Sequence, residues 1–291
     1  MTAAPTGPTG PTLTDLSASI DAIATRMPGP LGLAAAQIRA VLLRLWRSPE
    51  YVIGVVAVPI ILYAMFGLPN AGELLPSGTD VGALMFASMT CYGLVSLAIF
   101  TFGADVAEER AAPWMRRMRS TPMPMWVYFV GKLAVGLLFS VLIIAGVWAT
   151  ARFGGHVQFD TGRLLRTCGV LLLGTLCFST MGYAIAYWFT PKAASAIANL
   201  IFLPLAFLSG FFMPLSQLPE VVRGISSYLP TYHFGQLVWG QMANAPADIV
   251  RFGTPSSGST LIDCLWVAGS FLVFGLLTVL GYRRDLERAR S

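Results

Sequence analysis

Long apolar segments separated by short polar connections recur along this chain. A helix needs about 20 predominantly apolar residues to cross the hydrocarbon core of a membrane, and six segments are long enough. The pattern therefore predicts an all-α integral membrane protein with six transmembrane helices. Their approximate ranges are 51–68, 81–103, 126–149, 165–189, 194–214 and 261–281.

The pattern before the first span changes twice. Residues 1–30 form a tail rich in Pro, Gly and Thr, for which we expect disorder or weak helicity. Residues 31–48 have helical periodicity, with an apolar stripe opposite Gln37 and Arg44 and with Arg39 at its margin. This is typical of an amphipathic helix lying in the membrane interface. Such a helix either anchors the domain or, as we favour, also docks a soluble partner.

Composition agrees with a membrane protein. Apolar residues make up 55% of the chain and charged residues 11%, against roughly 25% charged residues in soluble domains, and the mean hydropathy is +0.68. The net charge of +5 does not indicate nucleic-acid binding, because its distribution follows the spans. The cysteines have no metal-ligand spacing, and no metal site is predicted. They lie in or beside apolar runs, at Cys91, Cys168, Cys177 and Cys264.

Lysine and arginine are distributed unequally between the two sides of the predicted membrane domain. If the N-terminus is cytoplasmic, 14 of these 19 residues lie on the inner side and five on the outer side. The positive-inside rule then places both termini in the cytoplasm of a cell whose plasma membrane holds the protein. Residues 49–283 form the six-span domain, and residues 284–291 form a basic cytoplasmic tail.

The loop between the second and third spans concentrates charge in the stretch "ADVAEERAAPWMRRMRSTPMPMW", residues 104–126. Acidic residues come first and basic residues follow, which complements a helix dipole. Pro113 disfavours helix at Ala112, so we expect a helix, a break and a second short helix. The loop is either a solvated positive-inside loop or a docking surface, and its mixed charge favours docking.

Two motifs are similar to those of a known family. "EERAAPWMRRMRSTPMPMWVYFVGK" resembles the cytoplasmic loop of ABC-2 type exporter permeases, and "NLIFLPLAFLSGFFMPLSQLPEVVRGISSYLPTYH" resembles their signature around the fifth span. The resemblance extends from about residue 30 to the end. The chain differs at Ala112-Pro113-Trp114, where relatives more often carry a glycine and no proline.

This resemblance implies a permease that works as a dimer, with a second copy or a paralogue, beside membrane lipid. Each half would dock an ABC ATP-binding subunit, which would hold the ATP and Mg²⁺. The residues that the resemblance implies for this coupling are Gln37, Arg39, Arg44, Glu108, Glu109, Arg110, Arg116, Arg117 and Arg119.

The chain itself has no motif for ATP hydrolysis. Its Gly131-Lys132 pair lacks the upstream glycine and the following Ser or Thr of a phosphate-binding loop. We find no nucleophile elbow and no cluster of histidine with carboxylates. The two histidines, His156 and His233, fall on the outer side, and we interpret them as structural. The sequence therefore predicts no catalytic residue, no cofactor and no enzyme activity for this chain.

The outer end after the fifth span is unusually apolar. Short helices are predicted on either side of Pro230, and we expect them to dip into the outer leaflet; an ordinary surface hairpin is the alternative. The following stretch, residues 245–260, is predicted to be an exposed loop. The resemblance implies that this region caps the transport path, with gate candidates Ser209, Gly210, Pro214, Pro219 and Pro230.

The second and fifth spans carry the candidate substrate-path residues. Met and aromatic side chains on the second and fifth spans suit amphipathic organic molecules, although in lipid such residues are usually ordinary packing. The path candidates are Met85, Phe86, Met89, Tyr92, Asn199, Phe202, Phe207 and Phe211. We expect export of a hydrophobic or amphipathic compound such as a drug, antibiotic or lipid. Polysaccharide or lipid-linked glycan export is the alternative. A secondary transporter is disfavoured, because no ionisable residue lies at mid-span.

Overall fold

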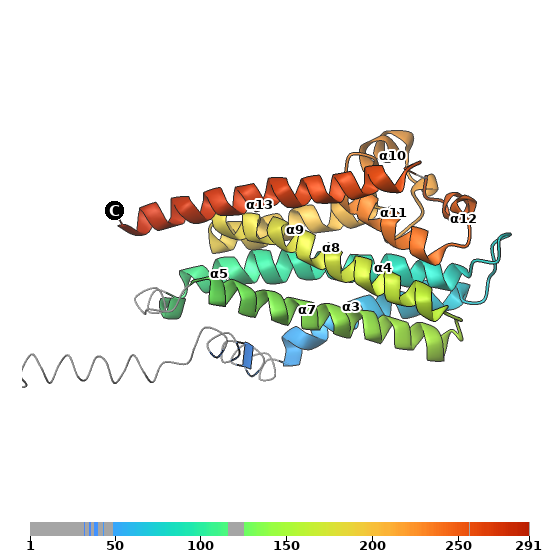
Figure 1. Cartoon of the computed structure of the whole chain (residues 1–291), viewed down its shortest axis with the longest axis horizontal. Coiled ribbons are helices and arrows are strands. Elements are labelled where there is room, and N and C mark those ends of the chain that lie inside the picture. Colours follow the sequence, from blue (N-terminus) through green and yellow to red (C-terminus); the bar gives the residue numbers. More distant parts are fainter. Residues whose placement is uncertain are drawn as a thin grey trace, which may run out of the picture.

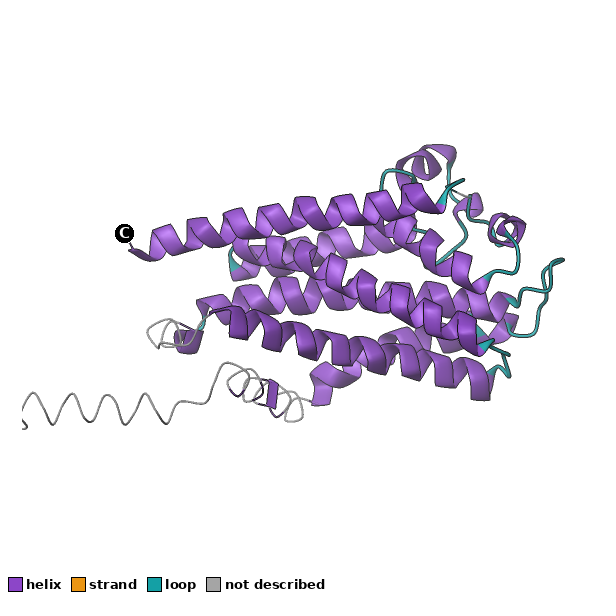
Figure 2. Ribbon diagram, in the orientation of Figure 1, coloured by secondary structure: helices purple, strands orange, loops and turns teal. Residues whose placement is uncertain are grey.

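The computed structural model describes residues 49–115, 125–255 and 257–290, together with Gly32, Ala35, Ile38, Arg39 and Leu43. Within these residues every regular element is a helix, and only an isolated bridge between Leu74 and Asp80 is of β type. Figure 2 shows these helices joined by short loops. Five coupling candidates lie outside the described residues: Gln37, Arg44, Arg116, Arg117 and Arg119.

Six helices are long and apolar enough to cross a membrane. This confirms the predicted all-α membrane protein with six spans. The main helices of these spans are α3 (Pro49–Phe66), α4 (Val81–Ile99), α7 (Met125–Ala149), α8 (Thr161–Trp188), α9 (Pro191–Leu208) and α13 (Thr260–Arg290).

The long helices run roughly side by side, and the two ends of the bundle differ (Figure 1). One end holds α5 (Asp105–Ala111) and the C-terminal end of α13, and we call it the α5 end. The opposite end holds α10 (Glu220–Ser226), the end of α11 (Pro230–Met242) and α12 (Pro246–Arg251); we call it the α12 end.

The second span is the centre of the bundle. Of its most apolar window 83% is buried by other elements, against 11% for the window in α13. The π-helical turn η2 (Phe100–Ala104) joins α4 to α5, so that one continuous helix runs from Val81 to Ala111. Ala112 is then extended and Pro113–Met115 is helical again. The predicted break is thus present.

Two sequence expectations at the α12 end are wrong. The fifth span ends at Leu208 rather than at residue 214, because Gly210 adopts φ +78°. The Phe211 N–H then bonds the Ala206 carbonyl, which closes the helix in a Schellman motif. Residues 245–260 are not simply an exposed loop, because they contain α12 and bury Asp248 completely.

Close helix packing in the bundle centre depends on a glycine in α8. A Cβ atom on Gly182 would lie 2.2 Å from the Ala98 carbonyl oxygen and 2.8 Å from Phe102 Cβ. Small residues allow membrane helices to approach in this way. The contact fixes α8 against the junction between α4 and η2, which immediately precedes α5.

Gly182→Ala should therefore destabilise the protein, even though alanine is the better helix former by about 1 kcal/mol. The added methyl group meets backbone that cannot move away, and overpacking typically costs about 1–3 kcal/mol. We expect a lower midpoint of thermal unfolding in detergent. Gly169→Ala is the matched control, because Gly169 also lies in α8 and has open space around its Cβ position. Equal midpoints for the two variants would contradict the close approach.

Candidate functional site

The carboxylate of Glu109 points from α5 into the bundle and is held by two side chains of α7. Tyr128 donates its hydroxyl to Oε2 at 2.6 Å, and Lys132 Nζ lies 3.0 Å from Oε1. The Glu109 and Lys132 side chains are only 10% and 7% exposed. A buried ion pair holds its geometry because separating it leaves an uncompensated charge. Glu109 thereby fixes α5 to α7.

The next residue, Arg110, fixes α5 to two further helices. Its guanidinium donates to the Ala186 carbonyl in the last turn of α8 and to Asp285 Oδ1 of α13, the latter at 2.7 Å. It also lies 4.6 Å from the centroid of the Tyr187 ring. A cation at a helix C-terminus satisfies unpaired carbonyls and complements the dipole, and its aromatic contact adds a cation–π attraction.

The described coupling candidates therefore form two groups, one exposed and one facing the bundle. Glu108 is exposed at the α5 end, whereas Glu109 and Arg110 face the bundle. Arg39 is helical and exposed. The inward direction of Glu109 was not predicted, although the sequence carries a signal for it: Phe102, Val106 and Glu109 recur at helical spacing, and all three are buried.

Three of the proposed path residues gather where α4 meets α9. Tyr92 lies 5.0 Å from Phe202 and 4.7 Å from Phe212, measured between ring centroids. Phe207 stacks on Phe212 at 5.0 Å and is 37% exposed. This aromatic cluster reaches the surface of the chain, as a contact for an amphipathic compound would require. Phe212 was not predicted, and Phe100 joins the same cluster through Phe202.

The remaining path candidates do not join that cluster through ring contacts. Phe86 packs edge-on against Phe159 and is fully buried, as is Met89. Phe211 is buried against Trp239. Met85 is partly buried, and Asn199 is exposed and donates to the Ser195 carbonyl within its own helix.

The gate candidates lie at helix ends and in loops of the α12 end, where hydrogen bonds and close contacts join these segments. The hydroxyl oxygens of Ser209 and Thr231 lie 2.5 Å apart, which joins the end of α9 to the start of α11. The Ser216 N–H donates to the Gly253 carbonyl. Gly253 also packs closely against Pro214, because a Cβ atom on Gly253 would lie 2.5 Å from the Pro214 side chain. The other three candidates shape the chain: Gly210 ends α9, Pro219 precedes α10, and Pro230 begins α11.

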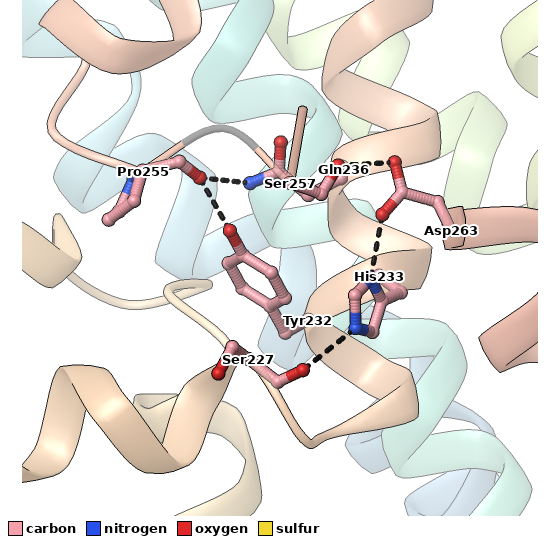
Figure 3. A network of polar contacts seen from close by, with 7 residues as sticks. All are labelled: Ser227, Tyr232, His233, Gln236, Pro255, Ser257 and Asp263. Carbon is pink, nitrogen blue, oxygen red and sulfur yellow. Dashed lines mark hydrogen bonds and ion pairs between the residues drawn. The ribbon is translucent and has the colours of Figure 1, made fainter. Parts of the chain in front are cut away.

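A second buried ionisable pair lies at this end and joins α11 to α13 (Figure 3). His233 Nδ1 lies 2.6 Å from Asp263 Oδ1, and its Nε2 lies 2.9 Å from the Ser227 carbonyl. A carbonyl only accepts, so Nε2 carries a proton. The imidazole stacks on Trp266, and Ser257 donates to the other Asp263 oxygen. Histidine and aspartate 30 residues apart carry no local sequence signal, so this pair was not predicted.

Two neighbours extend the His233–Asp263 pair toward the loop before α13. Burial and the nearby Asp263 carboxylate raise the pKa of Tyr232 to about 12. Its hydroxyl therefore stays protonated and donates to the Pro255 carbonyl, which also accepts from Gln236 (Figure 3). The residues that the structure describes contain no cluster of three His, Cys, Asp or Glu side chains suited to a metal ion. The His233–Asp263 pair and its neighbours thus join α11 to α13.

Removing one partner of the Glu109–Lys132 pair should strongly destabilise the fold. Glu109→Gln leaves a buried ammonium unpaired, a change that typically costs about 3–5 kcal/mol. We expect a clear loss of thermal stability in detergent, and a smaller loss per substitution in the double variant Glu109→Gln with Lys132→Met. Glu108→Gln is the control, because Glu108 is exposed. If Glu109→Gln were as stable as this control, the buried pair would be refuted.

Comparison with known proteins agrees with this architecture. The family model described as ABC-2 type transporter matches residues 34–242. The chain is 26% identical over 220 residues to the protein named "Putative transport permease YvfS" of Bacillus subtilis (strain 168), covering 75% of this chain and 86% of that protein. It is 27% identical over 203 residues to "Nodulation protein J" of Rhizobium leguminosarum bv. trifolii, covering 67% and 74% respectively. Since the family model spans most of the sequence, the chain belongs to the ABC-2 type transporter family.

Proposed function

We propose that this chain is the membrane permease of an exporter driven by a separate ATP-binding subunit that docks at the α5 end. Members of the ABC-2 family are membrane transport subunits, and the family implies an ABC ATP-binding partner. In this proposal the α5 end is cytoplasmic, in agreement with the excess of lysine and arginine expected there. A second permease copy or paralogue completes the transporter in the plasma membrane.

The observation that carries this proposal is the attachment of α5 to the rest of the bundle. The segment continues α4 without interruption, and Glu109 and Arg110 bind it to α7, α8 and α13. A force applied to the exposed side of α5 would therefore act on four spans together. Glu108 is the described acidic residue of α5 that is exposed for contact with the ATP-binding subunit.

We propose a hydrophobic or amphipathic substrate such as a drug, antibiotic or lipid. The aromatic cluster of Tyr92, Phe202, Phe207 and Phe212 supports this class, because it offers ring faces and no fixed charge. Export of polysaccharide or lipid-linked glycan is the second candidate, since one relative is named as a nodulation protein and not as a drug permease.

Ion-coupled secondary transport is less well supported. In the described ranges, the buried carboxylates within candidate spans are Glu109 and Asp263. Each is already paired, and they lie near opposite ends of the bundle. A coupled transporter typically places such groups near mid-membrane, where they bind the coupling ion.

Purification of the tagged chain from its native membranes tests the proposal directly. We expect recovery of a protein with a phosphate-binding loop, and ATP hydrolysis by the complex that stops when that loop is mutated. A chain that never recovers such a subunit under mild extraction would overturn the proposed exporter. Transport of fluorescent amphipathic compounds against glycan precursors in proteoliposomes then separates the two substrate classes.

Glu108→Lys should uncouple ATP hydrolysis from transport in the reconstituted complex. The reversed charge alters an exposed contact while the Glu109 and Arg110 attachments stay intact, so thermal stability should not change. We expect transport to fall at least tenfold for each ATP hydrolysed. Glu220→Lys is the control, because Glu220 is also exposed but lies at the α12 end. Wild-type coupling in Glu108→Lys would show that this residue takes no part in docking.

A further inference from the structure

An apolar groove lies between α8, α9, α13 and the start of α11, and its cavity volume is about 440 Å³. This lies within the range of roughly 300–1,000 Å³ that is typical of small-molecule sites. Its lining, which we call the α8–α13 groove, includes Met181, Ile185, Trp188, Ile201, Leu205 and Phe274.

The groove offers a ligand no free polar partner along its length. The Thr231 hydroxyl at one end is bonded to Ser209, and the Trp188 indole N–H at the other end donates to the Leu277 carbonyl. A ligand with polar groups along its length would lose hydrogen bonds to water on entering such a groove. The lining therefore suits a hydrocarbon chain.

A positive charge lies at the end of the groove that is nearer to α5. The exposed Arg284 places its guanidinium 5.6 Å from the centroid of the Trp188 ring. Among the described residues, Arg284 forms no ion pair, so its charge remains available to an anion. Gly281 makes this arrangement possible, because a Cβ atom there would lie 2.9 Å from Trp188 Nε1.

The distance along α13 between the charge and Phe274, which lines the groove, fits one leaflet of a bilayer. Phe274 precedes Arg284 by ten residues in α13, which is about 15 Å along a helix. Half of a hydrocarbon core of about 30 Å has the same thickness. A molecule with an anionic head at Arg284 and a tail ending near Phe274 would thus match both features.

We propose that the α8–α13 groove binds one acyl chain of an anionic phospholipid whose phosphate contacts Arg284. Bilayer lipid surrounds the outward face of a multi-pass membrane protein, and anionic lipids gather at basic sites near helix ends. The Trp188 ring would lie at the level of the headgroup, where amphipathic rings are favoured. Lipid binding here is independent of the proposed export function.

Photo-crosslinking of the full-length chain in phosphatidylcholine nanodiscs tests this site. The probes are phosphatidylglycerol and phosphatidylcholine, each with a diazirine near the end of one acyl chain. We expect the anionic probe to label peptides covering residues 181–189, 201–205 and 274–277, about fivefold more than the zwitterionic probe. Arg284→Ala should remove this preference, and Arg283→Ala, at the adjacent exposed arginine, should keep it.

A second pair of variants tests the groove without changing charge. Ile201→Trp fills the groove from a position that is 40% exposed and should abolish labelling by both probes. Leu200→Trp is the control, because Leu200 is 74% exposed and does not line the groove.

Three outcomes would overturn the proposed lipid site. The first is equal labelling by the two probes together with no effect of Arg284→Ala. The second is label spread evenly over the exposed faces of α3 and α7, which do not line the groove. The third is the absence of any lipid adduct in the groove although the chain is labelled elsewhere, which is the result expected if a second copy covers this surface.

Discussion

Burial of the Glu109 carboxylate is the constraint on which the α5 end of this protein depends. An ionised group removed from water needs an opposite charge and hydrogen bonds, and Lys132 and Tyr128 of α7 supply both. Successive helical residues differ in direction by about 100°. Once Glu109 is fixed inward, Arg110 is turned toward α8 and α13 and Glu108 toward the exterior. One buried pair therefore sets the directions of all three charged residues.

The same physical constraint acts at the α12 end, where His233 and Asp263 join α11 to α13. Between the two ends the described helices are held mainly by apolar packing and by close approaches such as that at Gly182. The buried ion pairs thus lie near the two ends, whereas apolar packing with a few hydrogen bonds, such as that between Ser140 and Thr175, holds the middle. This division follows from the solvent, because hydrocarbon provides no hydrogen bonds to a group that is exposed to it.

Sequence periodicity was sufficient to predict six spans, since the length of each apolar run reflects membrane thickness. The break at Ala112 was also predictable, because Pro113 restricts its neighbour locally. The direction of Glu109 and the pairing of His233 with Asp263 were not, because they depend on side chains from distant segments. The end of α9 was placed too late because the apolar run continues past Gly210, where the backbone turns out of the helix. The hydrophobic pattern alone does not show where the backbone makes such a turn.

The sixth span connects the two polar ends although it is the least buried of the six. Asp263 at one end is hydrogen-bonded to His233, and Asp285 at the other accepts from Arg110. These carboxylates are 22 residues apart, about 33 Å along a helix. Thr278 and Trp188 add hydrogen bonds between α8 and α13 along the way. A displacement of α5 through Arg110 thus has a direct physical connection along one continuous helix to α11, which forms part of the α12 end.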